Sequence, residues 1–133
     1  MNRLIFFYQT ISMKKILVVD DDTDILEVVK IVLTSYGFEV GTHSSGLGVP
    51  EIVTAFHPHI ILLDINLPGK SGVEICKELK ENTDIPILLF SAHADKKSIV
   101  QEAMADGFIE KPFEVTHLLN TINSHVNAKV SIF

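Results

Sequence analysis

Acidic residues stand at two places in the sequence where they could support metal and phosphoryl chemistry. Asp20, Asp21 and Asp22 form one run, and Asp64 follows a run of four apolar residues. Carboxylates that lie close together repel one another, and a bound divalent cation removes that repulsion. Mg²⁺ prefers oxygen ligands, typically one or two carboxylates, several waters and a substrate phosphate. The acids therefore predict a Mg²⁺ site for phosphoryl chemistry, if the fold brings them together.

Two further polar residues, Ser91 and Lys111, complete a set suited to phosphoryl transfer. The Lys111 ammonium could neutralise one phosphoryl oxygen, and the Ser91 hydroxyl could donate a hydrogen bond to another. Phosphoryl transfer needs mainly positioning and charge neutralisation, and this set supplies both. A carboxylate can itself accept the group and form an aspartyl phosphate.

The elements that must position these residues are alternating strands and helices. Short apolar, β-branched runs predict three buried strands, and two weaker runs predict strands nearer the sheet edges. Helical periodicity, caps and stop signals predict five helices between and after them. The expected strands are Ile16–Val19, Phe38–Val40, Ile60–Leu63, Ile87–Phe90 and Phe108–Glu110, and the expected helices are 22–36, Val49–Phe56, Gly72–Glu81, Asp95–Ala105 and Val115–Val126.

This alternation predicts an α/β fold with a parallel sheet covered by helices on both faces. Ligands of such folds bind at the carboxyl ends of the strands, where the acids, Ser91 and Lys111 all follow a strand. We expect the first helix to turn Ile25, Val28, Val29 and Val32 toward the core, because these residues follow helical spacing.

Length and composition fit one domain, for which we expect residues 14–126. With 133 residues there is no room for a second domain, so residues 1–13 are expected to be a dispensable extension and 127–133 a tail. The apolar run near the start is too short to span a membrane. A net charge of −6 argues against nucleic acid and anionic membranes as partners. A single cysteine excludes an internal disulfide and fits a reducing, cytoplasmic compartment.

Four segments in order resemble a known family. They are 16–22, with Asp20, Asp21 and Asp22 after a strand; 61–69, with Asp64; Ser91-Ala92; and Lys111-Pro112-Phe113. Together they are similar to the receiver domain of two-component response regulators, the CheY-like superfamily. That resemblance implies a flavodoxin-like (βα)5 sandwich with strand order 2-1-3-4-5.

The resemblance also implies a role for each matching residue. Asp64 would be the phosphoacceptor, and Ser91 and Lys111 would contact the phosphoryl group. Asp21, Asp64 and the backbone carbonyl of Asn66 would bind Mg²⁺, with Asp20 acting through water. Ser91 and Phe108 would form the conformational switch, and the Lys111-Pro112 peptide bond would be cis.

The sequence departs from the usual family pattern at two positions. Ser91 stands where Thr is frequent, and Met104 stands where Gly often ends the fourth helix. Asn66 and His93 hold the positions that flank the phosphoryl site and tune its lifetime in that family.

The leading hypothesis is a single-domain response regulator rather than an enzyme, limited to its own phosphorylation and autodephosphorylation. A histidine kinase or a histidine phosphotransfer protein would donate the phosphoryl group. Output would pass to another protein, and a monomer or weak dimer would use the surface of the fourth helix, fifth strand and fifth helix. The alternatives are a haloacid-dehalogenase-like phosphatase with Asp20 as nucleophile, and a receiver-like binding module that is never phosphorylated.

Overall fold

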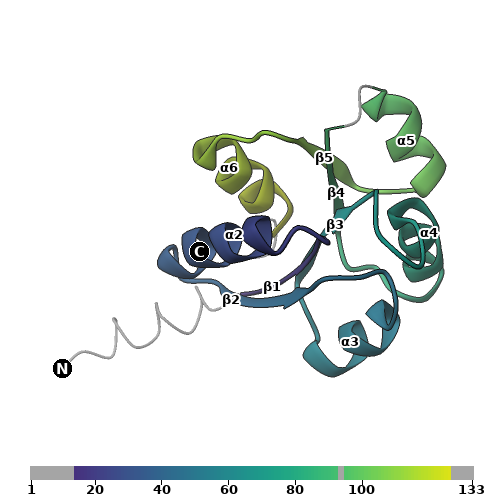
Figure 1. The fold of residues 1–133 in the computed structure, drawn as a ribbon, viewed down its shortest axis with the longest axis horizontal. Coiled ribbons are helices and arrows are strands. Elements are labelled where there is room, and N and C mark those ends of the chain that lie inside the picture. The colour runs from purple at the N-terminus through teal and green to yellow at the C-terminus, as the bar shows by residue number, and fades with distance from the viewer. Residues whose placement is uncertain (1–13, 93–94, 127–133) are drawn as a thin grey trace.

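Five parallel strands form one sheet in the order β2-β1-β3-β4-β5 (Figure 1). The computed structural model describes residues 14–92 and 95–126, so His93 and the segments 1–13 and 127–133 lie outside the described residues. The predicted fold class and strand order are confirmed, including the two weaker strands at the edges. The strands are β1 (Lys15–Val19), β2 (Glu39–His43), β3 (Ile60–Asp64), β4 (Ile87–Ser91) and β5 (Gly107–Glu110).

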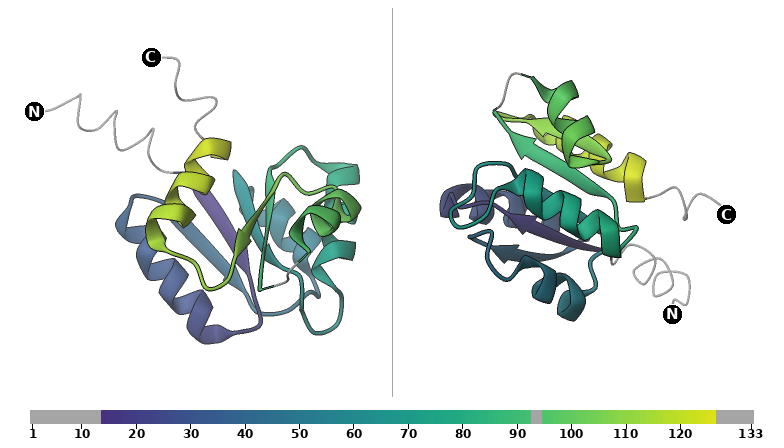
Figure 2. Two further views of the ribbon diagram at one scale, coloured as in Figure 1. Left: turned by 90° about the horizontal axis from the view of Figure 1, so that it is seen from above. Right: turned by 90° about the vertical axis from the view of Figure 1, so that its right-hand side faces the viewer.

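Helices cover both faces of this sheet (Figures 1 and 2). Two of them, α2 (Thr23–Ser35) and α6 (Val115–Val126), lie on one face. The other face carries α3 (Val49–Phe56), α4 (Gly72–Asn82) and α5 (Lys96–Ala103). In this three-layer arrangement, the carboxyl ends of the parallel strands lie together at one end of the sheet.

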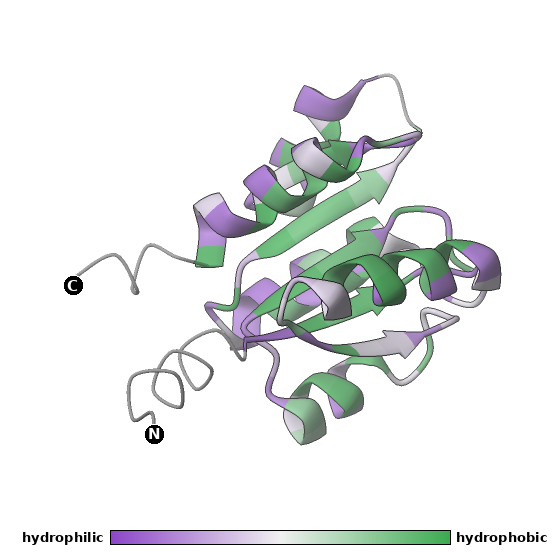
Figure 3. Ribbon diagram, turned by 90° about the vertical axis from the view of Figure 1, so that its left-hand side faces the viewer, coloured by the Kyte–Doolittle hydropathy of each residue, from purple (hydrophilic) through white to green (hydrophobic). Residues whose placement is uncertain are grey.

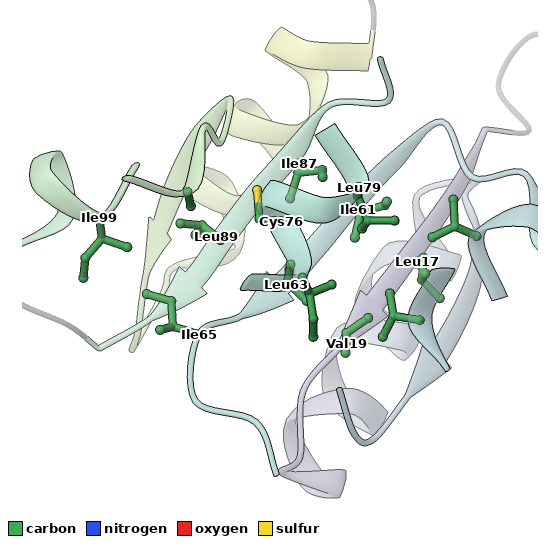
Figure 4. Packing of buried hydrophobic residues seen from close by; sticks show 14 residues of the cluster. Leu17, Val19, Ile61, Leu63, Ile65, Cys76, Leu79, Ile87, Leu89 and Ile99 are labelled. Carbon is green, nitrogen blue, oxygen red and sulfur yellow. The ribbon is translucent and has the colours of Figure 1, made fainter. Parts of the chain in front are cut away.

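The central strands are apolar on both faces because each face packs against helices. Successive side chains of a strand point to opposite faces, so Leu17 and Val19 meet one helical layer while Ile16 and Val18 meet the other. Figure 3 shows the central strands as mostly hydrophobic, and Figure 4 shows the cluster between the sheet and the layer of α3, α4 and α5. Cys76 lies in that cluster, and burial raises the pKa of its thiol to about 11.

The inward face of α2 differs from the predicted one. Leu26, Val29 and Leu33 are the buried residues of the helix, whereas Val28 is 53% exposed. Seven of the residues from 25 to 33 are apolar, so several overlapping stripes satisfy helical spacing and the sequence alone does not select one. Contact with the sheet selects the stripe of Leu26, Val29 and Leu33. Val29 is the one residue of the predicted stripe that is fully buried.

Most predicted boundaries agree with the structure to within two residues, and α3 agrees at both ends. The clearest difference is β2, which begins after Phe38 and continues to His43. Asp22 is the N-cap of α2, where its carboxylate accepts hydrogen bonds from the amides of Asp24 and Ile25. In the described part of the chain, no helix has the length and apolar character needed to cross a membrane.

Candidate phosphoryl-acceptor site

The site lies where four strands end side by side. Asp20 and Asp21 follow β1, Asp64 is the last residue of β3, and Ser91 is the last residue of β4. Lys111 follows β5, and its amide donates a hydrogen bond to the Ser91 carbonyl oxygen at 2.9 Å. The parallel register therefore brings together residues that are up to 91 positions apart in the sequence.

Three carboxylates form the acidic part of the site. One oxygen from each of Asp20, Asp21 and Asp64 lies within 4.8 Å of the other two. Asp20 is fully buried and Asp64 is 4% exposed, whereas Asp21 is exposed. The site thus has a buried floor and one carboxylate open to solvent.

Lys111 is the cation that faces this group. Its Nζ lies 2.6 Å from Oδ2 of Asp20 and 3.4 Å from Oδ2 of Asp64. The same ammonium lies 4.9 Å from the centre of the Phe90 ring, which adds a cation–π contact. Lys111 therefore bridges the two buried acids and partly balances their charge.

The pKa of Asp64 is raised above its ordinary value of 3.8. Burial is the largest cause, and repulsion from Asp20 is the second. Lys111 and the amide of Asn66 act in the opposite direction, since both stabilise the ionised carboxylate. Asp64 is thus a carboxylate whose charge is poorly compensated by the protein alone, and a cation or a covalent group at this position would relieve it.

The backbone after β3 holds the Asp64 side chain from one side. The Asn66 amide donates to Oδ1 of Asp64 at 3.2 Å, and the Gly72 amide donates to the Ile65 carbonyl at 2.8 Å. A Cβ at Gly72 would collide with the carbonyl oxygen of Asp64, so glycine is required for this close approach. Ser71 caps α4 by accepting from the Glu74 amide, which fixes where the loop ends.

The remaining predicted site residues that the structure describes lie on β4, on β5 and directly after β5. Ser91 is 2% exposed at the end of β4, and Phe108 is half-buried on β5, packed against the core beside α4 and α5. The Lys111-Pro112 peptide bond is cis, the isomer that the resemblance implied. His93 lies outside the described residues.

Sequence reasoning missed how strongly Asp20 is engaged. Its Oδ1 accepts from the Asp22 amide at 2.9 Å, while its Oδ2 forms the shorter of the two ion pairs with Lys111. The contact of the Lys111 ammonium with the Phe90 ring was also missed, as was the packing of that ring against Phe113 at 5.3 Å between ring centres. The Lys111-Pro112-Phe113 motif was the available signal for Phe113, but nothing in the sequence pairs Lys111 with Asp20 rather than Asp64.

The acidic cluster fits a Mg²⁺ ion. All three side chains offer hard oxygen ligands, and the exposed position of Asp21 leaves room for waters and a phosphate oxygen. The raised pKa of Asp64 indicates the charge imbalance that such an ion would correct.

The fold and this acidic site define a receiver-type α/β domain, and comparison with known proteins agrees. Residues 16–123 match the family model described as the response regulator receiver domain, so the chain belongs to that family. Members of this family are signalling modules that receive signals from histidine kinases and act on downstream targets; phosphorylation and magnesium are typical of them.

Relatives and solved structures support the same assignment. The DNA-binding response regulator MtrA of Mycobacterium tuberculosis is 33% identical over 115 residues, which cover 85% of this chain and 50% of that protein. The probable transcriptional regulator ycf27 of Cyanophora paradoxa is 35% identical over 86% of this chain and 48% of its own length. The chain therefore spans about half the length of these curated relatives.

Two solved receiver structures are similar over nearly their whole length. The BeF3-activated N-terminal receiver domain of RstA from Klebsiella pneumoniae has a TM-score of 0.81 and 29% identity, covering 85% of this chain and 98% of that one. The chemotaxis protein CheY4 of Vibrio cholerae has a TM-score of 0.79 at the same identity and the same coverage.

Proposed function

We propose that this receiver domain accepts a phosphoryl group on Asp64 from a histidine kinase or a histidine phosphotransfer protein. The observation that carries the proposal is the position of the Asp64 carboxylate. It ends a buried central strand, lies among two other carboxylates and is reached by the Lys111 ammonium at 3.4 Å. Such an arrangement suits a carboxylate that becomes covalently modified.

In the proposed reaction, a carboxylate oxygen of Asp64 attacks the phosphorus atom of a phosphohistidine. The new oxygen–phosphorus bond forms as the phosphorus–nitrogen bond breaks, and the donor imidazole leaves with the bonding electron pair. Asp64 must be ionised to attack, and Lys111 and the Asn66 amide favour that form. After transfer, Lys111 and Ser91 hold the phosphoryl oxygens, and Phe108 responds to the movement of Ser91.

Mg²⁺ would be held by Asp21, Asp64 and the backbone carbonyl of Asn66, with Asp20 contributing through water. When bound, the ion would supply the positive charge that the transferring phosphoryl oxygens require. Asp20 and Asp64 each have one oxygen on a backbone amide and the other near Lys111, but the contacts of Asp20 are shorter, at 2.9 and 2.6 Å against 3.2 and 3.4 Å. Asp20 is also fully buried, so it serves better as an anchor for Lys111 than as a nucleophile.

The experiment that tests this proposal is phosphorylation with acetyl phosphate and Mg²⁺, followed by intact mass and site mapping. Wild type should gain one phosphoryl group on Asp64, and Asp64→Asn should gain none. Asp84→Asn, which changes an exposed acid away from the site, is the matched control and should behave as wild type. Label on Asp20 with steady hydrolysis of phosphomonoesters would support the phosphatase alternative, and equal uptake by Asp64→Asn would reject the proposal.

We further propose that the protein is a cytoplasmic, single-domain regulator whose output is contact with another protein. Its net charge of −6 supports a protein partner over nucleic acid or an anionic membrane. The mass of the natural product tests the single-domain proposal. A native protein near 14.8 kDa is expected, whereas a product near twice that mass would indicate an added output domain.

The proposed contact surface is the one formed by α5, β5 and α6. Met104 is 58% exposed there, and Lys96 pairs with Glu110 at 3.2 Å across α5 and β5. We propose a monomer, or a weak dimer formed through this surface. Light scattering across a concentration series tests it, since Glu110→Lys should abolish any self-association, and association that persists in this variant would place the contact elsewhere.

A further inference from the structure

The loop between β2 and α3 packs against the loop that follows the phosphoryl-acceptor strand. We call these segments the 44–48 loop and the 65–71 loop. The Gly46 amide donates a hydrogen bond to the Pro68 carbonyl oxygen at 3.2 Å. The two loops lie at the start of α3 and α4, the neighbouring helices on one face of the sheet (Figures 1 and 2).

The contact between the loops is too close for ordinary side chains at two positions. A Cβ at Gly46 would collide with the Lys70 carbonyl oxygen, and Gly46 is buried. A Cβ at Gly69 would lie 2.9 Å from Cγ of Leu47, so the Leu47 side chain rests directly on the Gly69 backbone. This contact gives a role to Leu47, which is otherwise a large apolar side chain with 63% of its surface exposed.

His43 holds the 44–48 loop in this position. Its Nε2 lies 2.6 Å from the Leu47 carbonyl oxygen, so the ring donates a hydrogen bond there. The Ser45 hydroxyl accepts from the Leu47 amide, which fixes the same residue from its other side. The backbone carbonyl of His43 also accepts from the Asp20 amide at 3.1 Å, so His43 connects the 44–48 loop to the acidic end of β1.

The geometry points to His43, Gly46 and Leu47 as positioning residues that hold the 65–71 loop, and with it the Asn66 backbone, in the geometry that the proposed Mg²⁺ site needs. None of the three touches a carboxylate of the site through a side chain in the contacts above. They act through backbone atoms at both ends: Asp20 on one side, and Pro68, Gly69 and Lys70 on the other. The inference deepens the proposed function, on which its metal-binding part rests.

The test compares His43→Ala with His59→Ala. Both histidines bond a backbone group, but His59 accepts from the Lys15 amide at the opposite end of the sheet. His43→Ala should weaken Mg²⁺ binding by about tenfold, a size typical for loss of an outer support of a metal site, and His59→Ala should leave it unchanged. Mg²⁺ affinity is measured by calorimetry on the unphosphorylated full chain, and thermal unfolding is recorded for both variants.

A second readout needs neither metal nor phosphate. Hydrogen exchange in Mg²⁺-free buffer should become faster at the amides of Gly46, Asn66 and Gly72 in His43→Ala, and not in His59→Ala. Leu47→Ala should show the same pattern, whereas Leu47→Met, which still covers Gly69, should resemble wild type.

The outcomes separate this inference from the proposed function. If wild type takes phosphate while His43→Ala and Leu47→Ala match it in both Mg²⁺ affinity and amide exchange, the positioning role is wrong and the proposed function stands. If exchange and Mg²⁺ affinity change as expected while wild type takes no phosphate, the positioning role stands and the phosphoacceptor proposal fails. Equal effects of His43→Ala and His59→Ala on Mg²⁺ affinity would reduce the role of His43 to general stability and overturn the inference.

Discussion

At the scale of single residues, the folded protein holds Asp64 in surroundings that oppose its ionisation. Its pKa in the folded protein is raised above 3.8 by burial and by the Asp20 charge. Between the unfolded and folded pKa values the folded protein binds more protons, so its stability falls as pH rises through this window. The ionised carboxylate therefore opposes folding at neutral pH when no cation is present.

Replacing Asp64 with Asn should stabilise the metal-free protein at neutral pH. The change removes the repulsion between Asp64 and Asp20, and Lys111 keeps its closer ion-pair partner, Asp20. The free energy of unfolding should therefore rise by an amount on the order of 1 kcal/mol. The gain should shrink as pH is lowered toward 3.8, where the wild-type carboxyl also becomes neutral. Urea unfolding in EDTA across this pH range measures it, and a variant less stable than wild type at neutral pH would contradict the assignment.

Lys111 should stabilise the metal-free protein because it compensates a fully buried charge. Lys111→Met leaves Asp20, which is 0% exposed, without its ion-pair partner and beside Asp64. Loss of one partner of a buried pair costs about 3 kcal/mol, and added Mg²⁺ should restore part of this loss. The control is Lys96→Met, which breaks an exposed pair with Glu110 and should change stability by less than about 1 kcal/mol. Similar losses in the two variants would mean that Lys111 does not compensate a buried charge.

At the scale of elements, local signals were sufficient where they act over a few residues. Gly48 and Pro50 set the start of α3, and Asp22 and Gly37 set the limits of α2. The inward face of α2 could not be obtained in this way, because it depends on contact with the sheet and the helix is apolar on most sides. The same limit applies to the 44–48 loop, whose packing on the 65–71 loop leaves no periodic pattern in the sequence.

Helix α5 ends at Met104, in a left-handed backbone conformation that glycine usually occupies. Met104 is the C-cap and has a φ of 61°, a left-handed conformation that side chains with a Cβ adopt at an energetic cost. Because Met104 is 58% exposed, Met104→Gly removes little packing and should stabilise the protein by about 1 kcal/mol. Met104→Ala keeps the Cβ and should give no such gain in thermal unfolding. Destabilisation by the glycine variant would show that Met104 contributes through its side chain instead.

At the scale of the whole molecule, the site residues were predictable because the topology brings strand ends together. Asp20, Asp64 and Ser91 each follow an apolar run, and Lys111 follows the weaker strand that ends at Glu110; a parallel sheet places such positions at one end. The pairing within the site was not predictable, since the preference of Lys111 for Asp20 depends on side-chain geometry. The sequence thus specifies which residues meet, and the packed structure determines which of them compensate one another.

The remaining prediction concerns the extent of the folded domain, for which the contacts at the start of β1 are decisive. The Lys14 carbonyl accepts from the Glu39 amide at 2.8 Å, and the Lys15 side chain donates to the Phe56 carbonyl at 3.1 Å. A chain of residues 14–126 keeps both contacts and should unfold within about 2 °C of the full chain, with the same phosphate uptake. A chain of residues 16–126 loses both and should unfold about 4 °C lower or more, because each net hydrogen bond contributes about 1 kcal/mol. Calorimetric unfolding of the three chains measures this, and loss of cooperative folding in the 14–126 chain would show that residues 1–13 or 127–133 belong to the domain.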